Sequence, residues 1–321
     1  MRILVTGGAG FIGSHLCERL VSEGHSVVAI DNFSTGGPSN LLGLHGSASF
    51  SLVESSILDS AILNRLINNS DYVFHLAAAV GVFNIVNHPL NSLVINIRGT
   101  ENVLEAAYAS SVPVFITSSS EVYGKNISDS LKESDDRILG SPVTLRWSYS
   151  EAKAIDESLA YAYFIEKQLE TRIVRFFNTV GPRQLGAYGM VVPRFVKAAL
   201  ANKPVTIYGD GSQTRCFAHV YDVIDAVIAV AFAENTIGKV INIGNDFEIS
   251  INLLAQKIID ETGSKSEIIY VPYEEAYGEG FEDMERRVPN IELINQLVGW
   301  KPKRDLSTII SDISAQMKKS S

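Results

Sequence analysis

Four side chains in the middle of the chain have types and spacing that suit catalysis: Ser119, Glu121, Tyr149 and Lys153. Because Lys153 follows Tyr149 by four residues, a helix would carry both side chains on one face. A nearby ammonium favours the tyrosinate, so we expect Lys153 to lower the pKa of Tyr149. Tyr149 would then act as a general base at neutral pH and take a proton from a substrate hydroxyl.

A glycine-rich loop near the N-terminus indicates a dinucleotide cofactor. Such a cofactor could accept a hydride from the carbon whose hydroxyl proton Tyr149 takes. Gly7, Gly10 and Gly13 follow a strand-like stretch over 2–6 and open a helical pattern over 14–23. In this context the first glycine allows a tight turn, the second lets a pyrophosphate approach the backbone, and the third lets the helix pack closely on the sheet. Asp31 ends the next predicted strand, about twenty residues after the loop, where an acid binds ribose hydroxyls and repels a 2′-phosphate. We therefore predict NAD rather than NADP as the cofactor.

Strand-like segments alternate with helical patterns beyond this first unit. The strand candidates are 26–31, 50–53, 72–76, 114–117, 172–176 and 240–243, and the clearest helical patterns are 93–109 and 149–170. Such alternation predicts an α/β fold with a Rossmann-type, doubly wound parallel sheet. We place an NAD-binding domain at 1–177, with a strand returning near 240–243, and a smaller α/β substrate lobe at 178–321.

Composition excludes several classes of protein. The 321 residues are 46% hydrophobic and 20% charged, which is ordinary for a globular protein. The formal net charge of −9 speaks against nucleic acid as a partner, because binding a phosphate backbone needs clustered Lys and Arg. Cys17 and Cys216 lie far apart and in no metal-ligand spacing, so we expect no disulfide framework and no metal, in a reducing cytoplasm. No apolar run is long enough for a bilayer, and we expect no membrane partner.

Short motifs occur in order through nearly the whole chain. Besides the glycine loop and the Tyr149–Lys153 pair, they lie at 75–78, 96–100, 117–124, 175–178, 181–183, 208–211 and 299–302. With these motifs the chain resembles the extended short-chain dehydrogenase/reductase superfamily, and within it the nucleotide-sugar epimerases, dehydratases and decarboxylases. The resemblance implies an enzyme that acts on a nucleotide sugar, preferably UDP-linked, through a transient 4-keto sugar, and that recycles its NAD within each turnover.

The resemblance also implies roles for individual residues. Ser119 would hydrogen-bond the sugar 4-hydroxyl, Tyr149 would be the base, and Lys153 would be its electrostatic partner. The implied cofactor-binding residues are Gly7, Gly10, Phe11, Ile12, Gly13, Asp31, Asn32, Ser56, Ile57, Leu76, Ala77, Ala78, Asn96, Tyr149 and Lys153. The implied substrate-binding residues are Ser119, Ser120, Asn178, Arg183, Val192, Tyr208, Arg215 and Arg287. The pair Ser56-Ile57 departs from the usual acidic-hydrophobic pair at the adenine edge, so we expect a weaker adenine contact.

The residues around Ser119 bear on which reaction follows the 4-keto step. In this superfamily an epimerase needs only Ser, Tyr and Lys, a dehydratase usually carries an Asp-Glu pair, and a decarboxylase typically carries Ser-Glu. This chain has Ser120-Glu121, and 213–217, 282–291 and 146–149 also resemble decarboxylase segments. We predict a UDP-uronate (UDP-glucuronate-type) decarboxylase, with a UDP-sugar 4-epimerase as the alternative and a dehydratase less favoured. Glu121 would be catalytic or would only order its loop, and Arg146 would bind a carboxylate or cover Trp147.

Two other functions stay open for this protein. A non-catalytic nucleotide-binding relative is disfavoured by the intact Ser119, Tyr149 and Lys153, and an oxidoreductase that releases NADH is a third possibility.

We expect His75 to be a hydrogen-bonded core histidine and the loop 184–190 to close over the substrate. The apolar stripes of the two long helices predict either a homodimer interface or ordinary core; we favour the homodimer. These stripes are Leu93, Ile97, Val103, Leu104, Ile155, Leu159 and Tyr163.

Overall fold

The computed structural model describes residues 1–81, 85, 87–186, 190–272, 275, 284 and 286–319. Within them a sheet of seven strands has the order β11-β6-β5-β4-β1-β2-β3, and every pairing in it is parallel. The strands are β1 (Arg2–Thr6), β2 (Ser26–Asp31), β3 (Phe50–Glu54), β4 (Tyr72–His75), β5 (Val114–Ser119), β6 (Thr171–Phe176) and β11 (Val240–Ile243). The predicted α/β class with a doubly wound parallel sheet is confirmed.

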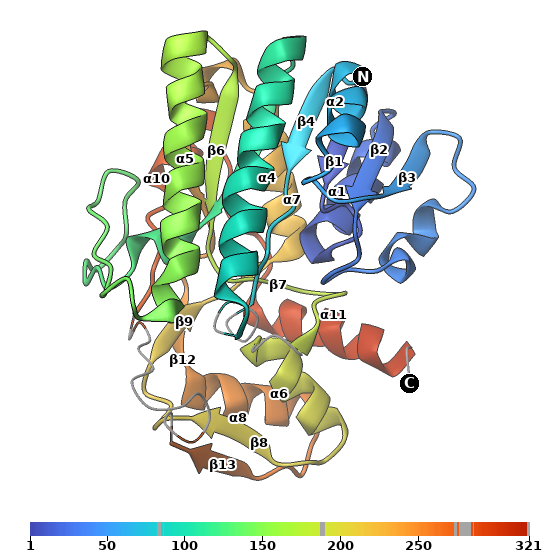
Figure 1. The fold of residues 1–321 in the computed structure, drawn as a ribbon. Helices are drawn as coiled ribbons and strands as arrows, with labels where there is room; N and C mark the ends of the chain where they lie inside the picture. Colours follow the sequence, from blue (N-terminus) through green and yellow to red (C-terminus); the bar gives the residue numbers. More distant parts are fainter. Residues whose placement is uncertain are drawn as a thin grey trace.

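Helices cover both faces of this sheet (Figure 1). One face carries α2 (Ser60–Asn68), α4 (Pro89–Ser110) and α5 (Ser148–Lys167), and the other carries α1 (Phe11–Ser22), α7 (Val220–Ala231) and α10 (Glu292–Val298). Successive strand side chains point to opposite faces, so each strand feeds two cores. In β1, for example, Ile3 and Val5 belong to the α1 and α7 core, whereas Leu4 belongs to the α2, α4 and α5 core.

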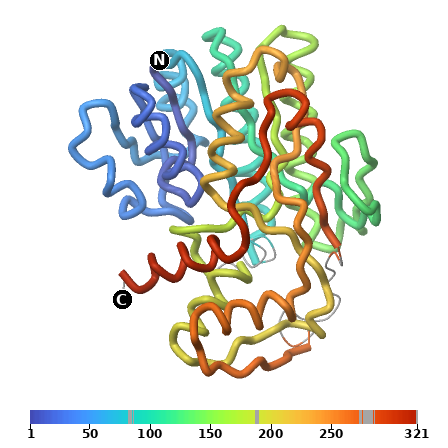
Figure 2. The backbone as a smooth tube through the Cα atoms, turned by 180° about the vertical axis from the view of Figure 1, so that it is seen from behind, coloured from blue at the N-terminus to red at the C-terminus, as the bar shows by residue number. Residues whose placement is uncertain are grey.

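A second, smaller core lies below the carboxyl ends of the strands (Figures 1 and 2). It is built from α6 (Val191–Leu200), β8 (Val205–Tyr208), α8 (Ile251–Thr262), β13 (Ile268–Val271) and α11 (Leu306–Lys319). Beyond the main sheet, the described residues form three two-stranded pairings: β8 with β13 within this core, β7 (Thr179–Val180) with β10 (Ala218–His219), and β9 (Thr214–Cys216) with β12 (Glu248–Ser250). The chain after 178 thus contributes to both regions, because α7, β11 and α10 return to the main sheet.

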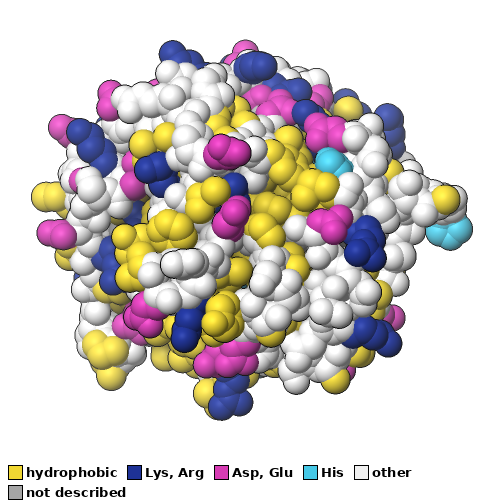
Figure 3. Space-filling view, turned by 90° about the horizontal axis from the view of Figure 1, so that it is seen from above, with side chains coloured by type: hydrophobic (Ala, Val, Ile, Leu, Met, Phe, Trp, Pro, Cys, Tyr) yellow, Lys and Arg dark blue, Asp and Glu magenta, His cyan; other side chains and the backbone are white. Residues whose placement is uncertain are grey.

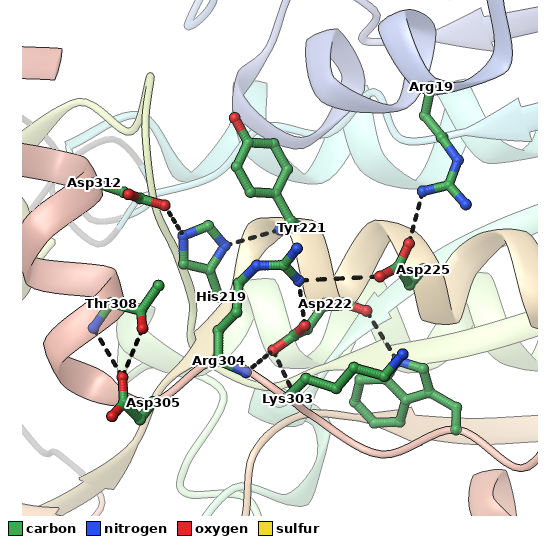
Figure 4. A network of polar contacts seen from close by, with 11 residues as sticks. Arg19, His219, Tyr221, Asp222, Asp225, Lys303, Arg304, Asp305, Thr308 and Asp312 are labelled. Atoms are coloured by element: carbon green, nitrogen blue, oxygen red, sulfur yellow. Dashed lines mark hydrogen bonds and ion pairs between the residues drawn. The ribbon is translucent and has the colours of Figure 1, made fainter. Parts of the chain in front are cut away.

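A polar network ties the segment before α11 to the main sheet (Figure 4). Asp222 in the first turn of α7 is 1% exposed and accepts hydrogen bonds from the backbone N–H groups of Lys303 and Arg304, at 2.9 and 2.8 Å. The Arg304 guanidinium also pairs with the same carboxylate. Directly before α7, the Nε2 of His219 lies 3.2 Å from the Oδ2 of Asp312 on α11.

The stripes of the two long helices divide between core and surface. Val103 and Leu104 of α4 are fully buried in the sheet core, and Leu93, Ile97, Leu159 and Tyr163 are half-buried. Ile155 is exposed, as are Leu90 and Tyr108 of α4 and Tyr161 and Ile165 of α5. Part of each stripe is therefore ordinary core, and an apolar surface remains over α4 and α5.

The molecular surface mixes charges of both signs. On the face seen in Figure 3, basic and acidic side chains are interspersed around hydrophobic side chains. Among the described residues, no helix is both long and apolar enough to cross a membrane.

Candidate active site

A cavity of about 480 Å³ lies where the carboxyl ends of the sheet strands meet the smaller lobe. Gly7 at the end of β1 and Ala77 after β4 both line it. The strand order reverses between β1 and β4, and open α/β sheets bind their ligands in the crevice at such a reversal.

The glycine loop forms a cradle that has no room for side chains. A Cβ on Gly13 would come 2.1 Å from the Gly7 carbonyl oxygen, and one on Gly7, whose φ is +70°, would come 2.8 Å from the Ala77 nitrogen. A Cβ on Gly10 would meet only the Gly7 carbonyl oxygen, at 3.1 Å, and would otherwise occupy the cavity that Gly10 lines. Helix α1 begins directly behind this loop, so its N-terminal dipole favours an anion there. The residues present fit a dinucleotide pyrophosphate.

Asp31, at the end of β2, is bound to the backbone of the glycine loop. Its carboxylate is buried and accepts hydrogen bonds from the backbone N–H groups of Ala9, at 2.9 Å, and Phe33, at 2.8 Å. Other residues predicted to hold the cofactor also line the cavity: Phe11, Ile12, Asn32, Ser56, Ile57, Leu76 and Ala78.

Ser119, Tyr149 and Lys153 come together at the other end of the cavity, which all three line. Ser119 ends β5, and Tyr149 and Lys153 lie in the first two turns of α5. The Ser119 hydroxyl acts to lower the pKa of Tyr149, because a nearby donor favours the charged phenolate. Lys153 is 2% exposed, and its Nζ donates to the Thr117 carbonyl oxygen and to Asp156 Oδ2, both at 3.0 Å.

The expectation that Lys153 leaves Tyr149 with a lowered pKa is wrong for this arrangement. Burial raises the pKa of Tyr149 and outweighs the lowering by Lys153, while Glu121 and Asp156 raise it further. The physical reason is desolvation, which disfavours the charged phenolate.

Glu121 lies between two arginines. Its Oε2 accepts from Arg146 Nη1 at 2.6 Å, and its Oε1 accepts from Arg287 Nη1 at 2.8 Å. Burial opposes the charge of Glu121, but the two guanidinium groups outweigh it and hold its pKa far below the usual range. Arg287 also donates to Ser120, and Arg146 lies over the Trp147 ring at 5.5 Å, so Arg146 contacts both the carboxylate and the aromatic face.

The wall formed by the smaller lobe carries further polar groups. Asn178, Tyr208 and Arg215 line the cavity, as predicted for substrate-binding residues, and Asn178 donates to the Cys216 carbonyl oxygen. Sequence reasoning missed Arg194, which lines the same wall and lies over the Tyr208 ring at 4.3 Å. Val192, two residues earlier on α6, was predicted instead.

Three predicted residues do not line the cavity. Asn96 bonds both polar backbone groups of Ala79 and so fixes the loop after β4. The Arg183 guanidinium is bound to both carboxylate oxygens of Glu18, at 2.7 and 2.8 Å. Val192 is fully buried in the core of the smaller lobe.

Some sequence expectations concern residues near the cavity. His75 is buried, with Thr6 and Thr100 on its two ring nitrogens, so its interpretation as a hydrogen-bonded core histidine is confirmed. Residues 282, 283 and 285 of the decarboxylase-like segment, and 187–189 of the loop expected to close over substrate, lie outside the described residues. In the described part of the chain, no cluster of His, Cys, Asp and Glu could hold a metal ion.

A doubly wound sheet with a glycine cradle and a Ser-Tyr-Lys constellation defines a dinucleotide-dependent enzyme of the short-chain dehydrogenase/reductase type. A family model described as the NAD dependent epimerase/dehydratase family matches residues 3–244. The chain belongs to this family, and the prediction of NAD as the cofactor is confirmed.

Individual relatives and solved structures show which enzymes of this family the chain is similar to. The chain is 42% identical over 302 residues to a UDP-N-acetyl-α-D-glucosaminuronate decarboxylase of Bacillus cytotoxicus, covering 94% of this chain and 92% of the relative. It is 34% identical over 303 residues to UDP-glucuronic acid decarboxylase 1 of Xenopus tropicalis, covering 94% and 68%. Among solved structures, a UDP-glucuronic acid 4-epimerase from Bacillus cereus, in complex with UDP-glucuronic acid and NAD, superposes with a TM-score of 0.88 at 30% identity, covering 100% of both chains.

Proposed function

We propose that this enzyme decarboxylates a UDP-linked uronate, with UDP-N-acetylglucosaminuronate as the first candidate substrate. The observation that carries the proposal is the Arg146–Glu121–Arg287 cluster, which lines the same cavity as Ser119, Tyr149 and Lys153. The cluster brings two guanidinium groups to the cavity, and guanidinium groups recognise a carboxylate through paired hydrogen bonds. The decarboxylase relatives support the same assignment.

The charge of the whole cavity supports an anionic substrate. The protein carries a formal charge of −9, yet the described lining includes five basic side chains, Arg146, Lys153, Arg194, Arg215 and Arg287, against two acids, Asp31 and Glu121. Arginine suits diphosphate and carboxylate groups, because its fork of donors matches their oxygens. A UDP-uronate offers both kinds of anion.

The residues divide the chemistry as follows. NAD, held by the glycine loop and Asp31, would supply reversible hydride acceptance from the sugar C4. The positive charge of a bound oxidised nicotinamide would favour the tyrosinate form of Tyr149. In that form Tyr149 takes the 4-hydroxyl proton while Ser119 hydrogen-bonds the developing ketone. The C5–C6 bond of the resulting β-keto acid then breaks, carbon dioxide leaves, and the electron pair passes onto C5 and the C4 oxygen. C5 takes up one proton before the ketone is reduced again.

Glu121 acts in this scheme as a charged partner of the two arginines. A carboxylate whose pKa is held far below its usual range is not a proton donor at neutral pH. We propose that the substrate carboxylate joins the same arginines and is oriented by them for loss of carbon dioxide.

The test is mass spectrometry of products from four substrates incubated with NAD and the protein: UDP-N-acetylglucosaminuronate, UDP-glucuronate, UDP-N-acetylglucosamine and UDP-glucose. We expect loss of carbon dioxide from a uronate and no change in the two neutral sugars. Tyr149→Phe, which lacks the base, serves as the inactive control. A product of unchanged mass with inverted C4 would instead identify a 4-epimerase and overturn the proposal.

We also propose a homodimer, formed through the exposed apolar surface of α4 and α5, and a cytoplasmic location. The support for the dimer is the exposure of five large apolar side chains on these helices: Leu90, Tyr108, Ile155, Tyr161 and Ile165. The division at 177/178 and the roles given to the cavity-lining residues stand as proposals in the same way.

A further inference from the structure

A second acid lies directly behind the catalytic lysine. Asp156 follows Lys153 by three residues on α5, so both side chains lie on one side of the helix. Asp156 is 0% exposed, does not line the cavity, and holds Lys153 Nζ at 3.0 Å from its Oδ2. A fully buried ion pair is costly to desolvate and gives weak net stability, so its presence calls for another explanation.

We propose that Asp156 is a positioning residue of this active site, whose carboxylate holds the Lys153 ammonium against the Thr117 carbonyl and sets the charge that Tyr149 meets. Lys153 has a long, flexible side chain, and two acceptors at 3.0 Å restrict where its ammonium lies. Any effect on turnover rests on the proposed function, whereas the effect on Tyr149 ionisation does not.

Asp156 receives its hydrogen bond from Lys153 in the described part of the chain. Its Oδ2 accepts from Lys153 Nζ, whereas its Oδ1 is buried with no hydrogen-bond partner among the described residues. A buried carboxylate with one oxygen left unbonded is costly, so the Lys153 ammonium is the group that offsets its charge.

The ionisable groups around Lys153 and Tyr149 come from every neighbouring element. His75 on β4 is neutral, since burial lowers its pKa to about 3. Glu121, after β5, is neutralised by Arg146 and Arg287, and Glu157 on α5 makes a bidentate pair with Arg175 on β6. Asp156 is therefore the carboxylate whose main charged partner is Lys153 itself.

This arrangement has a predictable effect on Tyr149. Lys153 favours the tyrosinate, and Asp156 opposes it by offsetting the lysine charge, so Asp156 keeps the pKa of Tyr149 raised. In Asp156→Asn the amide oxygen can still accept from Lys153, but the negative charge is gone. We expect the pKa of Tyr149 to fall by about one unit.

The direct test is titration of Tyr149 in the NAD-free protein by NMR of ring-labelled tyrosine, with Tyr149→Phe assigning the resonance. The expected result is the lower pKa in Asp156→Asn and no change in Glu166→Gln, which removes an exposed acid from the same helix. An unchanged Tyr149 titration in folded Asp156→Asn overturns the proposal. If that variant does not fold, Asp156→Ser takes its place with the same two outcomes.

The pH profile of turnover gives a second readout, on whichever substrate the product test identifies. In Asp156→Asn we expect the acid limb of the kcat–pH profile to shift to lower pH by about one unit, because this limb follows the ionisation of Tyr149. The KM should stay within about twofold, because Asp156 does not line the cavity. Asp156→Glu, which restores the charge, should return the limb toward its original position. A fall in kcat at every pH with an unmoved acid limb would show a merely structural role and overturn the proposal.

Discussion

Glu121 is held as a charged carboxylate because two guanidinium groups reach it from different segments of the chain. Arg146 comes from the short 3-10 helix Leu145–Trp147 and Arg287 from the segment before α10. Both arginines are at most 7% exposed, so neither can be solvated if the carboxylate is removed. The three side chains are thus one electrostatic unit, and the state of each depends on the other two.

Glu121→Gln should destabilise the folded protein by about 3 kcal/mol at pH 7, since it removes the carboxylate that two buried guanidinium groups share. The folded-state pKa of Glu121 lies below its ordinary value of 4.5, so its contribution is complete above that value. The contribution is lost only as the pH falls through the lowered folded-state pKa. Urea unfolding at pH 7 and pH 5 should show the same loss, with the exposed Glu166→Gln unchanged. Wild-type stability in Glu121→Gln would contradict the ion cluster.

The sides of helix α5 face three different surroundings: the cavity, the core against the sheet, and solvent. Tyr149 and Lys153 face the cavity, Ala160 packs in the core beneath the sheet, and Ile165 is 57% exposed. The exposed apolar side of this helix is the surface that we propose a second copy covers.

If the proposed dimer forms through this surface, Ile165→Glu should convert it to a monomer, because the substitution would place a charge in an apolar interface. Sedimentation velocity at micromolar concentration measures the change. The matched control is Leu253→Glu on α8, a position of similar exposure (63%) on the smaller lobe. A wild-type protein that sediments as a monomer would refute the homodimer, and equal effects of the two variants would refute this interface.

At the scale of the whole molecule, the smaller lobe is held to the sheet by polar groups as well as by packing. The network of Figure 4 joins α7 of the main sheet to the segment that enters α11. Asp222 satisfies two backbone N–H groups of that segment and pairs with Arg304. Since α11 packs in the core of the smaller lobe, this carboxylate fixes the connection between the two regions.

Asp222→Ala should lower the free energy of unfolding by about 2–4 kcal/mol, because buried donors lose their acceptor. Chemical denaturation measures the loss, and hydrogen exchange should become faster at the amides of Lys303 and Arg304. Asp246→Ala, at an exposed position, is the control. Equal stability of the two variants would show that the network does not hold the lobe.

The sequence by itself determined what depends on local pattern. Strand and helix periodicity gave the parallel sheet, and the glycine spacing with Asp31 gave the dinucleotide cradle, because both arise within one βαβ unit. Of the predicted site residues, all but Asn96, Arg183 and Val192 line the cavity. The side chain of Asn96 binds backbone, that of Arg183 pairs with Glu18, and that of Val192 fills a core.

Only the tertiary structure decided how the site is charged. Arg287 reaches Glu121 across 166 residues of sequence, and no local spacing indicates that contact. Burial outweighs the expected lowering of the Tyr149 pKa by Lys153, because desolvation depends on everything packed around the phenol. Asp156 was visible as an acid three residues after the lysine, but its contact with Lys153 required the helix to be buried against β5 and α4. Protonation states follow from burial and from long-range partners, which sequence spacing does not specify.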